Sequence, residues 1–237
     1  MPAEIFVIIG LVIAVYVAVF MFQKHKKEKI ANALNSLNLD IEFANISSYH
    51  NELLYKDFAI VRKQYLGASI DAFMAAITDY SMKDQLKDTA KNSLKTLATA
   101  GMVKFHTVNT PKYLVIVGDE LHLLDTDTDG KVSERFVFKK DSLLTASIEE
   151  LNQKKDAQQK VFSSIGLKDL KKYMLKLNVA DKTISLVFYD YLSAGVEENA
   201  GLSALFMSNT KSIIRNKVVA KHFMKIMGEH FSNLKVM

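Results

Sequence analysis

An uncharged apolar run, Ile5–Phe22, lies near the N-terminus and limits how the rest of the chain can be arranged. In an α-helix its eighteen residues would rise about 27 Å, close to the roughly 30 Å hydrocarbon core of a bilayer. Its many β-branched residues would also suit a buried strand, but such strands are only about 4–8 residues long. The length of the run therefore predicts a transmembrane helix within residues 1–23.

The flanks of the run indicate an uncleaved signal anchor with a defined direction. A secretory signal peptide has a basic N-terminal segment and a cleavage site between small residues. Here Glu4 is the only charged side chain before the run, and Phe20-Met21-Phe22-Gln23 ends it. The positive-inside rule places the more basic flank in the cytoplasm, which predicts a single-pass membrane protein with an outside N-terminus and a cytoplasmic C-terminal domain. The basic flank consists of Lys24, Lys26, Lys27 and Lys29.

Two sets of residues in this region are candidates for contacts. The four lysines are expected to contact the membrane surface and to hold a juxtamembrane linker, residues 24–45, against anionic headgroups, at about 1 kcal/mol each. Gly10, Ala14 and Ala18 recur at every fourth position, and small residues at this spacing let membrane helices pack closely. The anchor is therefore a candidate for packing against another membrane helix, including that of a second copy in a homo-oligomer.

The rest of the sequence gives no sign of catalytic chemistry. The chain contains no cysteine, which excludes disulfides, cysteine-ligated zinc and a catalytic thiol. Dinucleotide, P-loop and zinc-protease motifs are absent, and the six histidines are scattered without ligand spacing. The net charge of +5 is mild and gives little support to nucleic-acid binding. We therefore expect no enzyme activity, cofactor or metal, with an unrecognised enzyme as an alternative.

Residues 46–101 have the pattern of a helical segment. Apolar residues at intervals of three and four predict two helices within Ser47–Tyr80, separated at Gly67, with a new N-cap at Ser69-x-Asp71. A third helix, Asp84–Ala100, carries lysines at i, i+4 spacing. This lysine ladder is either a solvated helix face or a surface that meets anionic lipid or an acidic partner. It consists of Lys83, Lys87, Lys91 and Lys95.

From residue 102 the pattern changes to short strands. Apolar runs separated by turn residues predict a series of antiparallel hairpins. Polar loops are expected at Asn152–Lys160 and Gly195–Gly201. The predicted strands are Met102–Val108, Tyr113–Val117, Glu120–Leu124, Val132–Lys139, one within Asp141–Glu150, Tyr173–Val179 and Thr183–Tyr189.

An acidic segment between two of these strands, Asp125-x-Asp127-x-Asp129-Gly130, matches the first half of a calcium-binding loop. Such a loop also has a bidentate carboxylate at position 12, and that position is Phe136 here. Asp and Gly are favoured in hairpin turns for their backbone conformations. We therefore interpret the segment as a turn, with ion binding left open.

A long amphipathic helix, Asn209–Phe231, is predicted to end the chain. Its broad apolar stripe is expected to pack on the core. Lys217, Lys221 and Lys225 form a basic row beside that stripe and are a second candidate surface for a partner or lipid.

Residues 102–237 resemble the pleckstrin-homology-like superfamily, including its GRAM-type members. The resemblance implies an α+β fold: a bent, nearly closed antiparallel β-barrel plugged at one end by a C-terminal helix, behind the transmembrane helix and the helical segment. It also implies a binding module for lipids or proteins. Lipid-binding members use a basic cluster in the first hairpin loop, for which the acidic turn Gly118-Asp119 stands here. The likeness is carried by the strand order and by Glu120–Asp125, Asp129-Gly130-Lys131, Phe136-Val137-Phe138, Asp141–Leu144, Leu175–Phe188 and the closing helix.

Two functional hypotheses follow. The preferred one is a membrane-tethered binding or scaffolding protein that recruits a protein partner or joins a membrane complex. The other is a protein that senses or handles anionic lipid at the membrane surface.

Overall fold

The computed structural model describes residues 3–78, 110–151, 162–163, 166–167, 169–179, 182–193 and 209–236. Several predictions lie outside these residues. They are the helix Asp84–Ala100 with Lys83, Lys87, Lys91 and Lys95, the strand Met102–Val108, and the loops Asn152–Lys160 and Gly195–Gly201.

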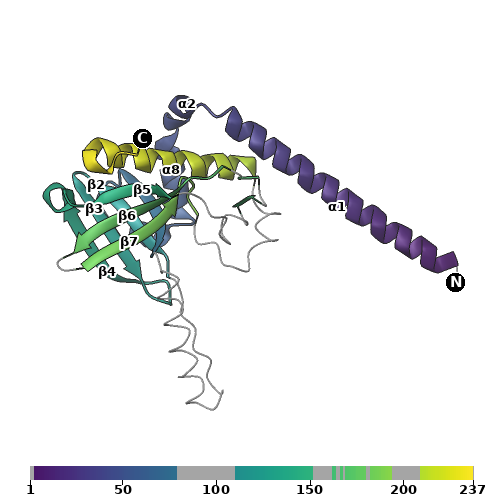
Figure 1. Cartoon of the computed structure of the whole chain (residues 1–237), viewed down its shortest axis with the longest axis horizontal. Coiled ribbons are helices and arrows are strands. Elements are labelled where there is room, and N and C mark those ends of the chain that lie inside the picture. The colour runs from purple at the N-terminus through teal and green to yellow at the C-terminus, as the bar shows by residue number, and fades with distance from the viewer. Residues whose placement is uncertain are drawn as a thin grey trace, which may run out of the picture.

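The predicted apolar helix is present and extends well past the apolar run. Helix α1 (Ala3–Asn35) is continuous over 33 residues and projects from the rest of the molecule (Figure 1). It is long and apolar enough to span a membrane, and none of its most apolar stretch is buried against the protein. A helix whose apolar side chains are exposed all round is compatible with a single-pass membrane protein.

Three short helices follow α1, and only part of the predicted helical segment is helical. They are α2 (Leu39–Phe43), α3 (Ile46–Tyr55) and α4 (Ala59–Gln64). Asn38 caps α2, because its side chain accepts hydrogen bonds from the backbone N–H groups of Asp40 and Ile41.

The prediction of a helix after Gly67 is wrong, because Ala72–Thr78 forms strand β1. Asp71 does not cap a helix; its carboxylate accepts a hydrogen bond from the backbone N–H of Gly118 at 2.6 Å. The strand is covered on both faces, so its sequence is continuously apolar and lacks the alternation of a half-exposed strand. Such a run has no period that separates a strand from a buried helix.

The three hairpins predicted from turn residues are confirmed in the strands that the structure describes. Gly118 and Gly130 adopt the left-handed backbone conformation that these turns require, with φ of 54° and 73°. The strand expected within Asp141–Glu150 begins later, because Lys140–Leu143 forms a 3₁₀ turn, η1. The strands are β2 (Lys112–Val117), β3 (Glu120–Thr126), β4 (Val132–Lys139), β5 (Ser147–Leu151), β6 (Lys172–Val179) and β7 (Lys182–Tyr189).

The seven strands form one antiparallel sheet in the order β4-β3-β2-β1-β7-β6-β5. β1 pairs with β2 through Ala72–Ala76 and with β7 through Ile77 and Thr78, so it joins a four-stranded part to a three-stranded part. The sheet is not closed, in contrast to the nearly closed barrel that was expected. Its edge strands are β4 and β5. In the sequence these two strands are separated by the 3₁₀ turn η1.

Helices cover the sheet. α3 and α4 pack on the four-stranded part: the Phe58 ring lies 5.2 Å from that of Phe73 and 5.9 Å from that of Tyr113. The predicted C-terminal helix is confirmed as α8 (Thr210–His230), which contacts β1 and packs Phe223 against Phe188 of β7. Asn209 is its N-cap and accepts from the N–H of Ser212.

A second apolar cluster joins α1 to this domain. Ile30, near the C-terminal end of α1, is 1% exposed and packs among side chains from a loop, β7 and the start of α8. The loop approaches closely at Gly166, where an added Cβ would lie 3.3 Å from the backbone oxygen of Lys27. The partners of Ile30 are Leu34, Phe162, Leu167, Leu170, Tyr189, Tyr191 and Ile213.

Truncation of Phe73 tests the assignment of β1 as a buried strand between two layers. Phe73→Ala should lower the free energy of unfolding by about 3–5 kcal/mol, because a fully buried aromatic side chain leaves a cavity. Leu66→Ala, at an 81% exposed position, is the control and should change it by less than about 0.5 kcal/mol. Denaturant unfolding of the full chain in mild detergent measures both, and equal effects would contradict the assignment.

Candidate functional site

The predicted membrane-surface lysines lie where α1 leaves its exposed apolar stretch. Lys24 and Lys29 are exposed, whereas Lys26 and Lys27 are partly buried. Gly10, Ala14 and Ala18 lie on the exposed part of α1, where the structure leaves them open to another helix. Lys24, Lys29 and the three small residues are therefore accessible for the contacts predicted from the sequence, whereas Lys26 and Lys27 are only partly accessible.

The basic row of α8 divides into two parts. Lys217 and Lys221 lie 2.7 and 3.0 Å from one carboxylate oxygen of Asp190, whose side chain is only 3% exposed. The other oxygen of Asp190 accepts a hydrogen bond from the backbone N–H of Lys171 at 3.0 Å. Burial lowers the pKa of Lys217, and Asp190 opposes that shift. This ion cluster fixes α8 to the end of β7, so Lys217 and Lys221 have a structural role.

Lys225 is the exposed member of the row. Its Nζ lies 5.2 Å from the centre of the Phe43 ring, a cation–π contact between α8 and α2. Of the basic row, Lys225 therefore keeps the accessibility that a partner or lipid surface needs.

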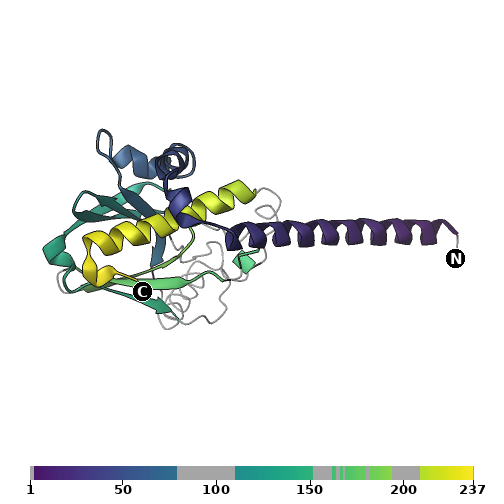
Figure 2. The ribbon, with the colours of Figure 1, turned by 90° about the horizontal axis from the view of Figure 1, so that it is seen from above.

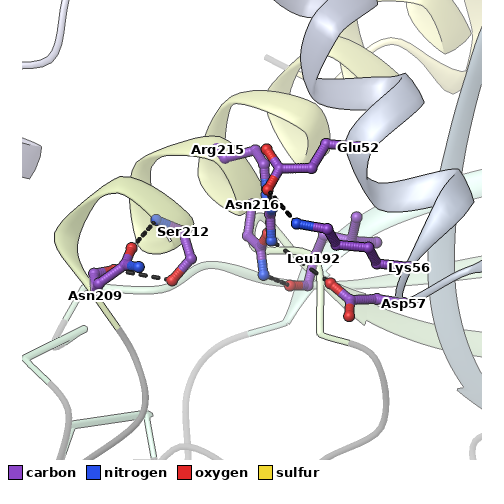
Figure 3. Close-up of polar contacts among 8 residues, drawn as sticks. All are labelled: Glu52, Lys56, Asp57, Leu192, Asn209, Ser212, Arg215 and Asn216. Atoms are coloured by element: carbon purple, nitrogen blue, oxygen red, sulfur yellow. Dashed lines mark hydrogen bonds and ion pairs between the residues drawn. The ribbon is translucent and has the colours of Figure 1, made fainter.

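A second ion cluster holds α8 to α3 (Figure 3). The Arg215 guanidinium lies 2.7 Å from Glu52 and 3.5 Å from Asp57, and its side chain is only 9% exposed. The hydrogen bond to Arg215 holds the pKa of Glu52 below its ordinary value. The side-chain amide of Asn216 donates to the backbone oxygen of Leu192, which ties α8 to the chain after β7.

A third polar group lies under α4. The His122 ring is 2% exposed and stacks on Tyr65. Its Nδ1 accepts from the Tyr65 hydroxyl at 2.8 Å and from Arg135 at 3.0 Å, while Nε2–H donates to Glu120 at 3.1 Å. Burial lowers the pKa of His122 and raises that of Tyr65 to about 12, so the ring stays neutral and the phenol keeps its proton. Both ring nitrogens of His122 and the Tyr65 hydroxyl therefore have hydrogen-bond partners in this buried contact between the end of α4 and β3.

Sequence inspection gave no sign of a histidine pair between α3 and α8. His50 and His222 have ring centres 5.2 Å apart, and Phe43 and Phe73 pack around them. Among the described residues, His50 Nε2 and His222 Nδ1 are buried without a hydrogen-bond partner. Burial is the main cause that lowers the pKa of both, to about 3 for His50. Because the two residues lie far apart in sequence, their spacing carried no signal.

The acidic turn serves the β3–β4 hairpin. Asp127 Oδ1 accepts from the backbone N–H groups of Asp129 and Lys131, at 3.0 and 2.8 Å, and Asp125 pairs with Lys112 of β2. These contacts agree with the interpretation of the segment as a turn. Within the part of the chain that the structure describes, no three potential metal ligands lie together.

The described polar clusters thus connect elements of the fold to one another. The junction of Ile30 with the loop at Gly166 instead connects the domain to α1, shortly after the uncharged apolar run Ile5–Phe22. A scan against models of known protein families gives no match, and a search among curated proteins finds no significant similarity.

Substitution of His50 tests the pH dependence built into the histidine pair. In the unfolded chain His50 takes up a proton near pH 6.5, whereas in the folded chain its pKa is about 3. The contribution of His50 to the free energy of unfolding is therefore fully present above pH 6.5 and is lost as the pH falls toward 3. In His50→Leu, the slope of the free energy of unfolding against pH in this range should be smaller by up to about 1.4 kcal/mol per pH unit.

Thermal unfolding followed by circular dichroism between pH 7.5 and pH 4.5 measures the effect. His230→Leu is the matched control, because His230 lies beside the 93% exposed Asp119 at the end of α8. An unchanged slope for His50→Leu, with parallel curves for all three proteins, would contradict the expected role of the pair.

Proposed function

We propose that this chain is a membrane-anchored binding or scaffolding protein that recruits a protein partner or joins a complex at the membrane. Its folded domain lies on the cytoplasmic side, where the basic flank after the apolar helix is expected to be. The exposed apolar helix α1 and the lysines that follow it support this placement.

The observation that carries the proposal is the packing of Ile30 into the domain. A flexible linker would be enough to keep a domain near a membrane. Here the anchor helix continues past the apolar stretch and is buried at one position by side chains from three parts of the fold. The anchor therefore sets the orientation of the domain as well as its location. A fixed orientation is useful to a protein whose surfaces must meet neighbours in the same membrane.

The resemblance to pleckstrin-homology-like domains adds support for a binding role. A series of antiparallel strands followed by one amphipathic helix that packs on the sheet is the order that this resemblance implies. The open sheet edges and the covering helices α3 and α4 are departures from that expectation.

The position of β1 favours anionic-lipid binding as a second candidate function. β1 precedes β2 among the described strands, so residues 79–111 lie between these two strands in the sequence. This segment includes the lysine ladder. The lipid-binding members of the resembled family use a basic cluster between their first two strands. With β1 as the first strand, Lys83, Lys87, Lys91 and Lys95 take the place that Gly118-Asp119 was expected to hold, and they are the residues to test.

Capture of the partner tests the first function. The tagged full chain, cross-linked in its native membranes and purified in mild detergent, should bring down a stoichiometric partner. Ile30→Asn should reduce recovery several-fold while leaving the chain in the membrane, because a polar side chain in the apolar cluster releases the domain. Ile41→Asn, at a 64% exposed position, is the control. No enrichment, or equal recovery with Ile30→Asn, would contradict the proposal.

Charge reversal of the lysine ladder tests the second function. A fragment that begins at Gln23 keeps Ile30 but lacks the membrane span. Its affinity for vesicles of phosphatidylcholine and phosphatidylserine is measured by co-sedimentation. Replacing the four ladder lysines by Glu should lower this affinity by about fivefold or more for each lysine that contacts the membrane surface. The same change at Lys131, Lys139, Lys140 and Lys182, which are exposed, controls for net charge. Equal loss in both variants would contradict a role for the ladder.

A further inference from the structure

The junction between α1 and the domain lies very close to the end of the apolar run. Gly166 packs against the backbone of Lys27, five residues after Phe22. Five helical residues rise about 7.5 Å, and a headgroup layer is roughly 5–8 Å thick on each side of the hydrocarbon core. Tilting of α1 would only reduce the height of Lys27 above the core. The loop at Gly166 is therefore no further from the hydrocarbon than the outer limit of the headgroups.

The elements around this junction lie at one end of the domain. α8 begins beside the C-terminal part of α1 and runs away from the apolar stretch (Figures 1 and 2). Ile213, in its first turn, packs in the same cluster as Ile30. The opposite end of α8 lies at the β2–β3 turn, where His230 is 3.4 Å from Asp119.

Cationic side chains are present at the same level. Lys24 and Lys29 of α1 and Lys211 in the first turn of α8 are exposed. Lysines near an anionic leaflet are attracted to its headgroups. Lys24, Lys29 and Lys211 outnumber the exposed acids Glu28 and Asp169 at this junction, and a net positive charge there matches an anionic leaflet.

We propose that the loop at Gly166 and the first turn of α8 rest on the headgroups of the leaflet from which α1 emerges. The domain then sits directly on its own bilayer, and the end at Asp119 and His230 faces away from it. This inference rests on the proposed membrane anchoring, but it does not depend on which side of the membrane the domain occupies.

Single-cysteine labels can test this placement in the full chain, since the natural sequence has no cysteine. Asp169→Cys places a fluorophore on the exposed part of the junction loop. Leu144→Cys places it at a 69% exposed position after η1. This site is near the far end of α8, because the backbone oxygen of the adjacent Leu143 accepts from Asn233.

Both labelled proteins are reconstituted in vesicles of phosphatidylcholine and phosphatidylserine. Flotation after alkaline carbonate extraction first tests anchoring alone, so loss of the protein from the vesicles would contradict the anchor and not the placement. In floated protein, a spin label on the lipid headgroup should quench the label at position 169 several-fold more than the label at position 144. Aqueous iodide should show the opposite preference. Equal quenching at the two sites by either agent would overturn the proposal.

A second variant tests whether the burial of Ile30 is what holds the loop at the headgroups. Ile30→Asn in the Asp169→Cys protein should remain with the vesicles and lose most of the headgroup quenching, because the apolar cluster no longer holds the loop. Unchanged quenching in that protein would overturn the role of the junction. Ile41→Asn, at an exposed position of α2, should retain the quenching of the parent protein.

Discussion

Burial of β1 on both faces is the constraint on which the other elements depend. This strand pairs with β2 and with β7 and so holds the two parts of the sheet together. Phe73 packs against His50 of α3 and against Phe58, which lies between α3 and α4, and α8 contacts the same strand. Without it, the hairpins on either side would have no common neighbour, and isolated hairpins are marginally stable in water.

The two ion clusters position α8 over this core. Asp190 is almost completely buried and is paired with two lysines and a backbone N–H, while Arg215 is held between Glu52 of α3 and Asp57, which follows α3. Buried ions are costly unless they are paired, so these groups favour one placement of the helix over alternatives that leave a charge alone. They specify where the helix lies, while its apolar side chains supply most of the stability.

Local signals in the sequence were enough for part of this fold. The apolar helix, the hairpins and the final helix follow from the length of the apolar run, from turn residues and from an apolar stripe at helical spacing, and each of these signals lies within one segment of the sequence. The sequence of β1 predicts a helix in error, because a strand buried on both faces loses its alternation. The helical spacing of α8 predicts a surface position for Lys217, because its partner, Asp190, is 27 residues away in the sequence. For the same reason neither the histidine pair nor the contact of Gly166 with α1 had a signal in the sequence.

Because the close contact at Gly166 and the burial of Ile30 hold α1 to the domain, the two should tilt together. Transmembrane helices change their tilt when bilayer thickness changes. α8, with 21 residues, extends about 30 Å from the junction. A change of about 10° in the tilt of α1 would therefore move its far end by about 5 Å. A flexible linker would absorb such a movement, whereas in the proposed membrane anchor this junction would transmit a change in bilayer thickness to the outer end of the domain.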